Sequence, residues 1–229
     1  MAYLRSGGVL LQQGGGGGSD PTFTETVLCD NSALSTGTLT LSDDIANYDF
    51  LKIELNNSTY SRDYFLLTCP EVVLALKSIS SNRVNFNELN TSQYKCYTLS
   101  ADNLTWTHYG SRNLVIKKII GLVCTNKTVS KTEIYKRASI STGSVTITPV
   151  EDVLSYDYIY LGTIDGASDE SQPCAFPVVL DKSNNNQIGV WNRYSGGGSL
   201  FYMENHLINA YTSDGNNYYL GCAYGVKFT

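Results

Sequence analysis

Apolar and polar residues alternate with a period of two along much of this chain. The pattern is clearest in "GTLTLS" (37–42) and "GSVTITP" (143–149), where apolar residues alternate with residues that carry a hydroxyl group. It continues in "YDFLKIEL" (48–55) and "YDYIYLGT" (156–163). Such alternation is typical of a strand with one buried and one solvated face, because successive side chains of a strand point to opposite sides. The chain is therefore predicted to be all-β.

This strand pattern occurs twice. The stretch "STGTLTLSDDIANYDFLKIEL" (35–55) nearly returns as "STGSVTITPVEDVLSYDYIYL" (141–161). The alignment also matches Thr24 with Thr132 and Gly121 with Gly225. We interpret the two copies as the product of an internal duplication.

Two further stretches are predicted to form long hairpins. "RVNFNELNTSQYKCYTLS" (83–100) turns at its Asn-Glu-Leu-Asn-Thr-Ser segment, and "IGVWNRYSGGGSLFYMEN" (188–205) turns at Gly196 to Gly198. Short strands separated by turn signals every 8 to 12 residues or so favour a β-sandwich for each copy. We expect two tandem jelly-roll-like sandwiches, with an immunoglobulin-like connectivity as the alternative.

Composition shifts divide the chain of 229 residues into four parts. The parts are an N-terminal arm with a Gly-rich linker (1–21), β-sandwich module 1 (22–123), a linker (124–131) and β-sandwich module 2 (132–229). The string "GGGGGSD" (14–20) has a backbone that is costly to order, so it is expected to act as a flexible linker or, alternatively, to be an engineered scar. The short arm before it is expected to dock on a larger assembly and to tether the globular part.

The charge pattern excludes some partners. The formal net charge is −5 and no basic block occurs, so a surface that neutralises nucleic-acid phosphates is not expected. No apolar run approaches the roughly 20 residues that span a bilayer, and no signal-peptide core precedes the linker, so neither membrane insertion nor export is expected. The cysteines are expected to be mostly reduced and half-buried, because they follow neither the repeat nor a metal-ligand spacing. They are Cys29, Cys69, Cys96, Cys124, Cys174 and Cys222.

Residues able to transfer protons or attack bonds are scarce. The chain has two histidines, His108 and His206, at positions that are not equivalent in the repeat, and both are interpreted as structural. No nucleophile elbow, zinc-protease motif or phosphate-binding loop is present. The sequence therefore predicts no catalytic residue and no cofactor.

The acidic residues are interpreted as structural too. Asp43-Asp44 and Glu151-Asp152 occupy matching loops, where carboxylates readily cap a turn or a helix. The cluster from Asp165 to Glu170 has enough oxygen ligands for calcium. It fits no standard calcium loop and has no counterpart in the first copy, so no metal is predicted.

Aromatic residues near the triple-glycine turn are the remaining candidates for binding. Trp191, Tyr194 and Tyr202 are predicted to form an exposed platform, because aromatic rings stack on the apolar faces of sugars while their polar edges donate hydrogen bonds. The alternative is that Trp191 and Phe201 are core residues of the hairpin and that the tyrosines cover a sheet.

The repeated elements resemble a known class of protein. The Ser-Thr-Gly strand, "YDFLKIEL" or "YDYIYLG", and the closing "KKIIGLV" or "CAYGVKF" are similar to repeated β-sandwich modules in minor structural and fibre proteins of bacteriophages and prophages. The resemblance covers both copies and implies a virion component, assembled in the cytoplasm of the bacterial host. It further implies attachment to other virion proteins, binding of host-surface glycans and a homo-oligomeric state.

The short chain favours a head fibre, decoration protein or tail-tip protein over a full tail fibre. Two alternatives stay open. One is a lectin-like carbohydrate-binding protein of cellular origin, and the other is a hydrolase without a known motif.

Overall fold

The fold is described here from a computed structural model of the chain. It describes residues 5–6, 9–10, 21–34, 36–56, 61–67, 83–87, 94–100, 102, 104–109, 115–136, 145–147, 155–165, 170–173, 178–179, 187–190, 199–204, 207–212 and 218–229. The described residues form strands, turns and short 3-10 segments, of which Ile45–Asn47 makes a complete helix. The prediction of an all-β chain is confirmed for this part of the molecule. Of the helices described, none is long and apolar enough to cross a membrane.

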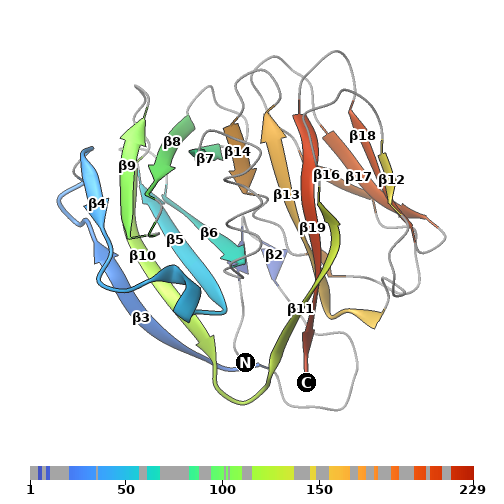
Figure 1. Cartoon of the computed structure of the whole chain (residues 1–229), viewed down its shortest axis with the longest axis horizontal. Helices are drawn as coiled ribbons and strands as arrows, with labels where there is room; N and C mark the ends of the chain where they lie inside the picture. Colours follow the sequence, from blue (N-terminus) through green and yellow to red (C-terminus); the bar gives the residue numbers. More distant parts are fainter. Residues whose placement is uncertain are drawn as a thin grey trace.

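One antiparallel sheet has four strands (Figure 1). Its strands, in spatial order, are β3 (Phe23–Asp30), β10 (Val115–Cys124), β5 (Phe50–Asn56) and β6 (Ser61–Leu67). β10 pairs with both β3 and β5, so it is the central strand of this sheet. It comes last of the four strands in the sequence and pairs with β3, which comes first.

A second sheet has nine strands, which come from both the first and the second part of the chain. Its main path is β11 (Val129–Lys136), β19 (Tyr218–Phe228), β13 (Tyr158–Asp165), β14 (Glu170–Pro173), β7 (Arg83–Asn87), β8 (Tyr94–Leu99), β9 (Thr105–Tyr109) and β4 (Thr38–Thr40). β15 (Val178–Val179) also pairs with β13. The two parts meet where β14 runs parallel to β7, with Ser171 opposite Val84.

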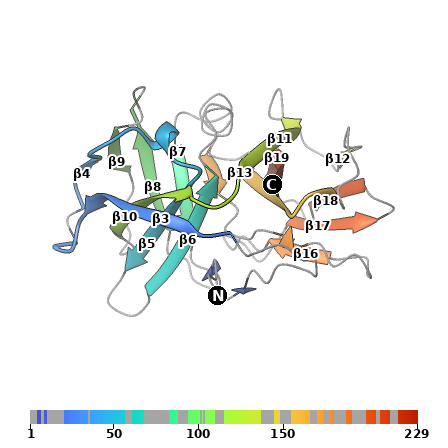
Figure 2. The same cartoon turned by 90° about the horizontal axis from the view of Figure 1, so that it is seen from below.

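Two smaller sheets complete the described structure. The first has the order β12 (Val145–Ile147), β18 (Leu207–Thr212), β17 (Ser199–Glu204) and β16 (Gln187–Val190). The second is a pair of short strands in the arm, β1 (Arg5–Ser6) and β2 (Val9–Leu10). In Figure 2, β3, β5, β6 and β10 lie on one side of the molecule and β16 to β18 on the other, with β11, β13 and β19 between them.

The predicted hairpins are present. β7 and β8 pair antiparallel, with Val84 opposite Tyr97, and β16 and β17 pair with Ile188 opposite Phe201. β9 continues from β8, so that β7, β8 and β9 form a meander.

The same strand order occurs in both parts of the chain, which we call the first half (22–124) and the second half (129–229). In the first half, Gly121 of β10 lies opposite Thr26 and Leu51. In the second, Gly225 of β19 lies opposite Thr132 and Ile159. This register equates Thr132 with Thr26, and it therefore corrects the sequence alignment of Thr132 with Thr24.

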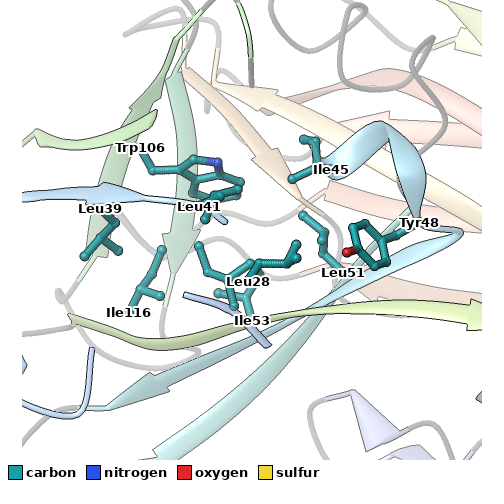
Figure 3. Close-up of a cluster of buried hydrophobic side chains, with 10 residues drawn as sticks. Leu28, Leu39, Leu41, Ile45, Tyr48, Leu51, Ile53, Trp106 and Ile116 are labelled. Carbon is teal, nitrogen blue, oxygen red and sulfur yellow. The ribbon is translucent and has the colours of Figure 1, made fainter. Parts of the chain in front are cut away.

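The hydrophobic core of the first half lies between two sheets (Figure 3). Leu28, Ile53 and Ile116 project from the four-stranded sheet, and Leu39 and Trp106 face them from β4 and β9. Ile116 and Ile53 are fully buried and Trp106 is 1% exposed. Sheets that pack face to face in this way bury alternate residues of each strand, which explains the period of two in the sequence. Leu28 occupies a bulge in β3, since the ladder passes from Cys29 to Val27 between neighbouring residues of β10.

Candidate functional site

The acidic pair Asp43-Asp44 caps a short 3-10 helix. Asp44 Oδ1 accepts a hydrogen bond from Ala46 N at 2.9 Å and forms the N-cap of Ile45–Asn47. Asp43 Oδ1 accepts from Asp44 N at 2.8 Å and from Asn47 Nδ2 at 2.9 Å. These bonds satisfy donors at the start of the helix. The predicted capping role is confirmed for this pair, whereas Glu151 and Asp152 lie outside the described residues.

Directly after the 3-10 helix, the ring of Tyr48 packs against β10, the central strand of the four-stranded sheet. A Cβ atom built on Gly121 would overlap the ring carbons of Tyr48, closer than real Cβ contacts come. The Tyr48 hydroxyl donates to Asp43 Oδ2 at 3.0 Å, which fixes the ring over the strand. Gly121 is therefore required here because the aromatic ring occupies the space of a side chain.

The next residue, Asp49, binds the same strand through its backbone and its side chain. Asp49 N donates to Leu122 O at 2.8 Å, and Cys124 N donates to Asp49 Oδ2 at 2.9 Å. A carboxylate that accepts from a backbone amide makes a stronger bond than a neutral acceptor does. We call Tyr48 and Asp49, with the strand residues they contact, the first Tyr-Asp pair.

The second half contains the same arrangement. A Cβ atom on Gly225 would overlap the ring of Tyr156. Asp157 N donates to Val226 O at 2.9 Å, and Phe228 N donates to Asp157 Oδ2 at 2.6 Å. Tyr156, Asp157 and Gly225 thus repeat the contacts of Tyr48, Asp49 and Gly121, and we call them the second Tyr-Asp pair.

The pKa shifts of Asp43 and Tyr48 indicate a structural role for both side chains. The hydrogen bond from Tyr48, together with the one from Asp44 N, lowers the pKa of Asp43 below its usual value of 3.8. Burial, together with the nearby Asp43 carboxylate, raises the pKa of Tyr48 above its usual value of 10.0. A general acid or base works best with a pKa near the working pH. Both shifts move away from neutrality, so these groups are suited to holding the loop rather than to transferring protons.

Three phenylalanines from both halves meet beside the Tyr-Asp pairs. The ring centroids of Phe23 and Phe50 are 5.8 Å apart, and those of Phe23 and Phe228 are 6.1 Å apart, both with edge-to-face geometry. Phe50 and Phe228 are 6.3 Å apart. Since Phe228 belongs to β19 and the other two to the first half, this cluster joins the halves.

A lysine of β11 completes the cluster. Lys131 Nζ lies 3.6 Å from Asp49 Oδ1 and 5.7 Å from the centroid of the Phe50 ring. Its side chain is 14% exposed and that of Asp49 is 26% exposed, so the ion pair is partly shielded from water. We call Phe23, Phe50, Phe228 and Lys131 the phenylalanine junction.

The predicted ligand residues are placed only in part. Tyr202 lies in β17, where its backbone is opposite Gln187 of β16 and Asn209 of β18. Trp191 and Tyr194 lie outside the described residues. The aromatic platform therefore stays a prediction.

The remaining candidate residues, the histidines and the acidic cluster at 165–170, are described only in part, and the described ones lie in strands. His108 is half-buried in β9, opposite Tyr97 of β8, while His206 lies outside the described residues. Asp165 and Glu170 face each other across the β13–β14 pair, and the residues between them lie outside the described part. In the part of the chain that the structure describes, no group of three His, Cys, Asp or Glu side chains is positioned to hold a metal ion.

Two cysteines are described as free thiols. Cys29 and Cys124 are half-buried and reduced, as the sequence predicts for them. Burial, followed by the nearby Asp30, raises the pKa of Cys29 above its usual value of 9.0. A raised pKa lowers the fraction of reactive thiolate, so Cys29 is suited to packing rather than to nucleophilic chemistry.

Comparison with known proteins gives no family for this chain. No protein-family model matches it, and neither a curated protein nor a solved structure matches it. The resemblance to phage modules therefore stays a hypothesis based on the sequence motifs.

The sequence does not predict the contacts within each half or those between the halves. The repeat shows the Tyr-Asp dipeptide twice and aligns Gly121 with Gly225, but it does not predict that each tyrosine contacts its glycine. The repeat itself carried this signal, because a glycine in a strand often marks a close approach. The phenylalanine junction had no comparable signal, since Phe23 and Phe228 have no aromatic counterpart in the other copy.

Proposed function

We propose that this chain is a non-enzymatic structural protein of a bacteriophage virion. In this proposal it is a head fibre, decoration or tail-tip component that attaches to other virion proteins through its N-terminal arm. Two tandem β-sandwiches, derived from one ancestral module by duplication, form its body. The second sandwich binds host-surface glycans, and the protein works as a homo-oligomer.

The observation that carries the proposal is the pair of matching Tyr-Asp contacts. Each half places a tyrosine ring over a glycine of its central strand and a carboxylate on a backbone amide of the same strand. The strand order β4-β9-β8-β7 likewise has its counterpart in β12-β18-β17-β16. Such agreement in contact and topology supports duplication, and tandem sandwich modules are the feature by which the chain resembles phage structural proteins.

The chemistry of the described residues supports a non-enzymatic role. The carboxylates Asp43, Asp44, Asp49 and Asp157 all accept hydrogen bonds from backbone or side-chain donors that hold strands and turns together. Carboxylates that hold strands and turns together in this way are part of the scaffold, which is the role expected of them in a binding or structural protein.

The arm supports attachment to a larger particle. It contains a two-stranded pair with Arg5 opposite Leu10, followed by the Gly-rich string before Pro21. A small docking element on a flexible tether raises the effective concentration of the body near its target. This arrangement suits a protein displayed on the outside of a virion.

Particle composition tests the proposal. Phage particles should be induced from the bacterium that carries the gene, banded in a density gradient and analysed by mass spectrometry. We expect peptides of this chain to band with capsid and tail proteins at constant stoichiometry. If the chain stays with the cell fraction and binds glycans there, the lectin-like alternative replaces the virion role.

A further inference from the structure

The four-stranded sheet of the first half is covered on both faces near the start of β5. Ile119 belongs to the core cluster, and Gly121 lies under Tyr48 of the same cluster. Because side chains alternate along a strand, Ile120 and Leu122 project from the opposite face. They are nevertheless only 4% and 2% exposed. Something other than the core between the two sheets therefore covers this outer face.

The phenylalanine junction contributes that cover. Phe50 lies opposite Leu122 in the ladder, so it shares the outer face, and it is only 4% exposed. The ring of Phe228, from the last strand of the second half, lies 6.3 Å from Phe50. Phe23 contacts both rings edge-to-face, and contacts of this kind add about 0.5–1.5 kcal/mol to the burial of their area.

The second half is buried at the equivalent position. Gly225 faces the ring of Tyr156. Its neighbours Tyr224 and Val226 project from the opposite face of β19 and are 2% and 0% exposed. Val226 corresponds to Leu122, because each carbonyl accepts a hydrogen bond from the backbone of its Tyr-Asp pair. Both central strands thus have two buried faces at this end of the molecule, as expected of strands between two packed layers.

The chain between the halves is short and hydrogen-bonded. Only residues 125–128 separate β10 from β11. Thr125 N donates to Thr22 O at 2.8 Å, and Thr128 N donates to Thr229 O at 2.7 Å. Thr229 N donates back to Thr128 O at 3.0 Å, so the last residue of the described chain is fixed against this connection.

A second contact lies away from the junction. β14 of the second half and β7 of the first half are neighbours in the nine-stranded sheet, with Ser171 opposite Val84. Figure 1 shows β14 between β7 and β13. The halves are therefore connected at two separate places as well as through the chain.

We infer that the two halves fold and unfold as one cooperative unit, and that the phenylalanine junction transmits stability between them. Tandem modules joined by a loose linker unfold separately, whereas modules that share buried apolar surface unfold together. The inference goes beyond the proposed function and does not depend on it. Its consequence is that the two halves keep one fixed geometry relative to each other.

The two tryptophans provide the experiment. The chain has Trp106 in the first core, 1% exposed, and Trp191 in the second half. In a Trp191→Phe background, tryptophan fluorescence reports the unfolding of the first half alone. Gly225→Ala is then introduced, so that the new methyl group collides with Tyr156 in the second half. Ala223→Gly, on the same strand, is the milder lesion if the first variant gives too little folded protein.

If the halves are coupled, the lesion in the second half lowers the midpoint of the Trp106 transition by about 4 °C or more, the size expected for a domain of this length. Adding Phe228→Ala and Lys131→Met to the background should remove the transmission. In that background, Gly225→Ala should change the midpoint of the Trp106 transition by no more than about 1 °C relative to the same protein with Gly225. A shift of this size is smaller than a destabilised core in the second half would cause if it were transmitted to the first half.

The inference is overturned if Gly225→Ala leaves the midpoint of the Trp106 transition unchanged in the background with an intact junction, while calorimetry shows that a second transition moves to lower temperature. It is also overturned if Gly225→Ala still lowers the Trp106 midpoint by the full amount after Phe228→Ala and Lys131→Met have removed the junction. Gly121→Ala is the matched control, because it places the same collision in the first half and must move the Trp106 transition in every background.

Discussion

The ring of Tyr48 occupies the space that a side chain at position 121 would need, and Gly121 is the residue that leaves this space open. The same relationship joins Tyr156 to Gly225. Each contact brings a loop back onto the central strand of a sheet, and each is followed by an aspartate that binds the strand backbone. A contact that recurs in this detail gives a direct way to test the fold.

Gly121→Ala should destabilise the chain because the methyl group forces Tyr48 away from β10. Overpacking of a buried site costs about 1–3 kcal/mol, which lowers the Tm by several degrees. The measurement is thermal unfolding followed by circular dichroism. Tyr48→Ala provides the double-mutant cycle. Once the ring is absent, adding Ala at position 121 should cost much less. Additive effects would show that ring and glycine do not interact.

Gly225→Ala should behave in the same way through Tyr156. We expect a Tm shift similar in size to that of Gly121→Ala, because the two glycines face equivalent ring atoms. Calorimetry on the full chain checks this. A harmless substitution at position 225 beside a damaging one at position 121 would contradict the equivalence of the two halves.

The pair formed by Asp43 and Tyr48 should make stability depend on acid. Hydrogen bonding from Tyr48 lowers the pKa of Asp43 in the folded chain below its value in the unfolded chain. The stabilisation is therefore present above the unfolded pKa, near 4, and is lost as the pH falls through the folded pKa. The Tm measured between pH 6 and 2.5, a range of about 3.5 units that includes that value, should fall less steeply in Tyr48→Phe than in the parent. Equal slopes in both proteins would exclude this linkage.

Trp191, Tyr194 and Tyr202 are predicted to form a glycan platform. Their joint replacement by Ala should abolish binding to host cells or to cell-wall glycans and lower the Tm by only a few degrees, because exposed aromatic residues contribute little to folding. The matched control replaces three exposed apolar residues of the first half, Val27, Leu34 and Val123, with Ala. Unfolding of the triple aromatic variant would instead show that these residues belong to a core.

The sequence predicted local structure well because local structure has a local signal. The period-two alternation around Leu39 and Ile53 corresponds to β4 and β5, and the hairpin expected from residue 83 is formed by β7 and β8. The capping role of Asp43-Asp44 was also predictable, since the acceptors lie within a few residues of their donors.

Contacts between distant segments were not predictable. Lys131 contacts Asp49, and Phe228 contacts Phe23, each from the other half of the chain. No periodicity in the sequence indicates such partners. The parallel pairing of Ser171 with Val84, which joins the halves in one sheet, has no local signal either. The sequence alignment places Thr24 two residues away from its structural position, because it matches the Thr-Glu dipeptides at 24–25 and 132–133. The ladders instead equate Thr132 with Thr26.

We propose that the chain is a virion component held by its arm. The most direct measurement compares the full chain with a variant that lacks residues 1–20, each supplied in trans to a phage lacking the gene. We expect both proteins to show the same Tm, because the described residues of the first core lie between Leu28 and Ile119, outside the arm. We predict that the full chain is recovered in gradient-purified particles at constant stoichiometry and that the truncated chain is absent from them. A truncated chain that is recovered with the particles as efficiently as the full chain would contradict the account.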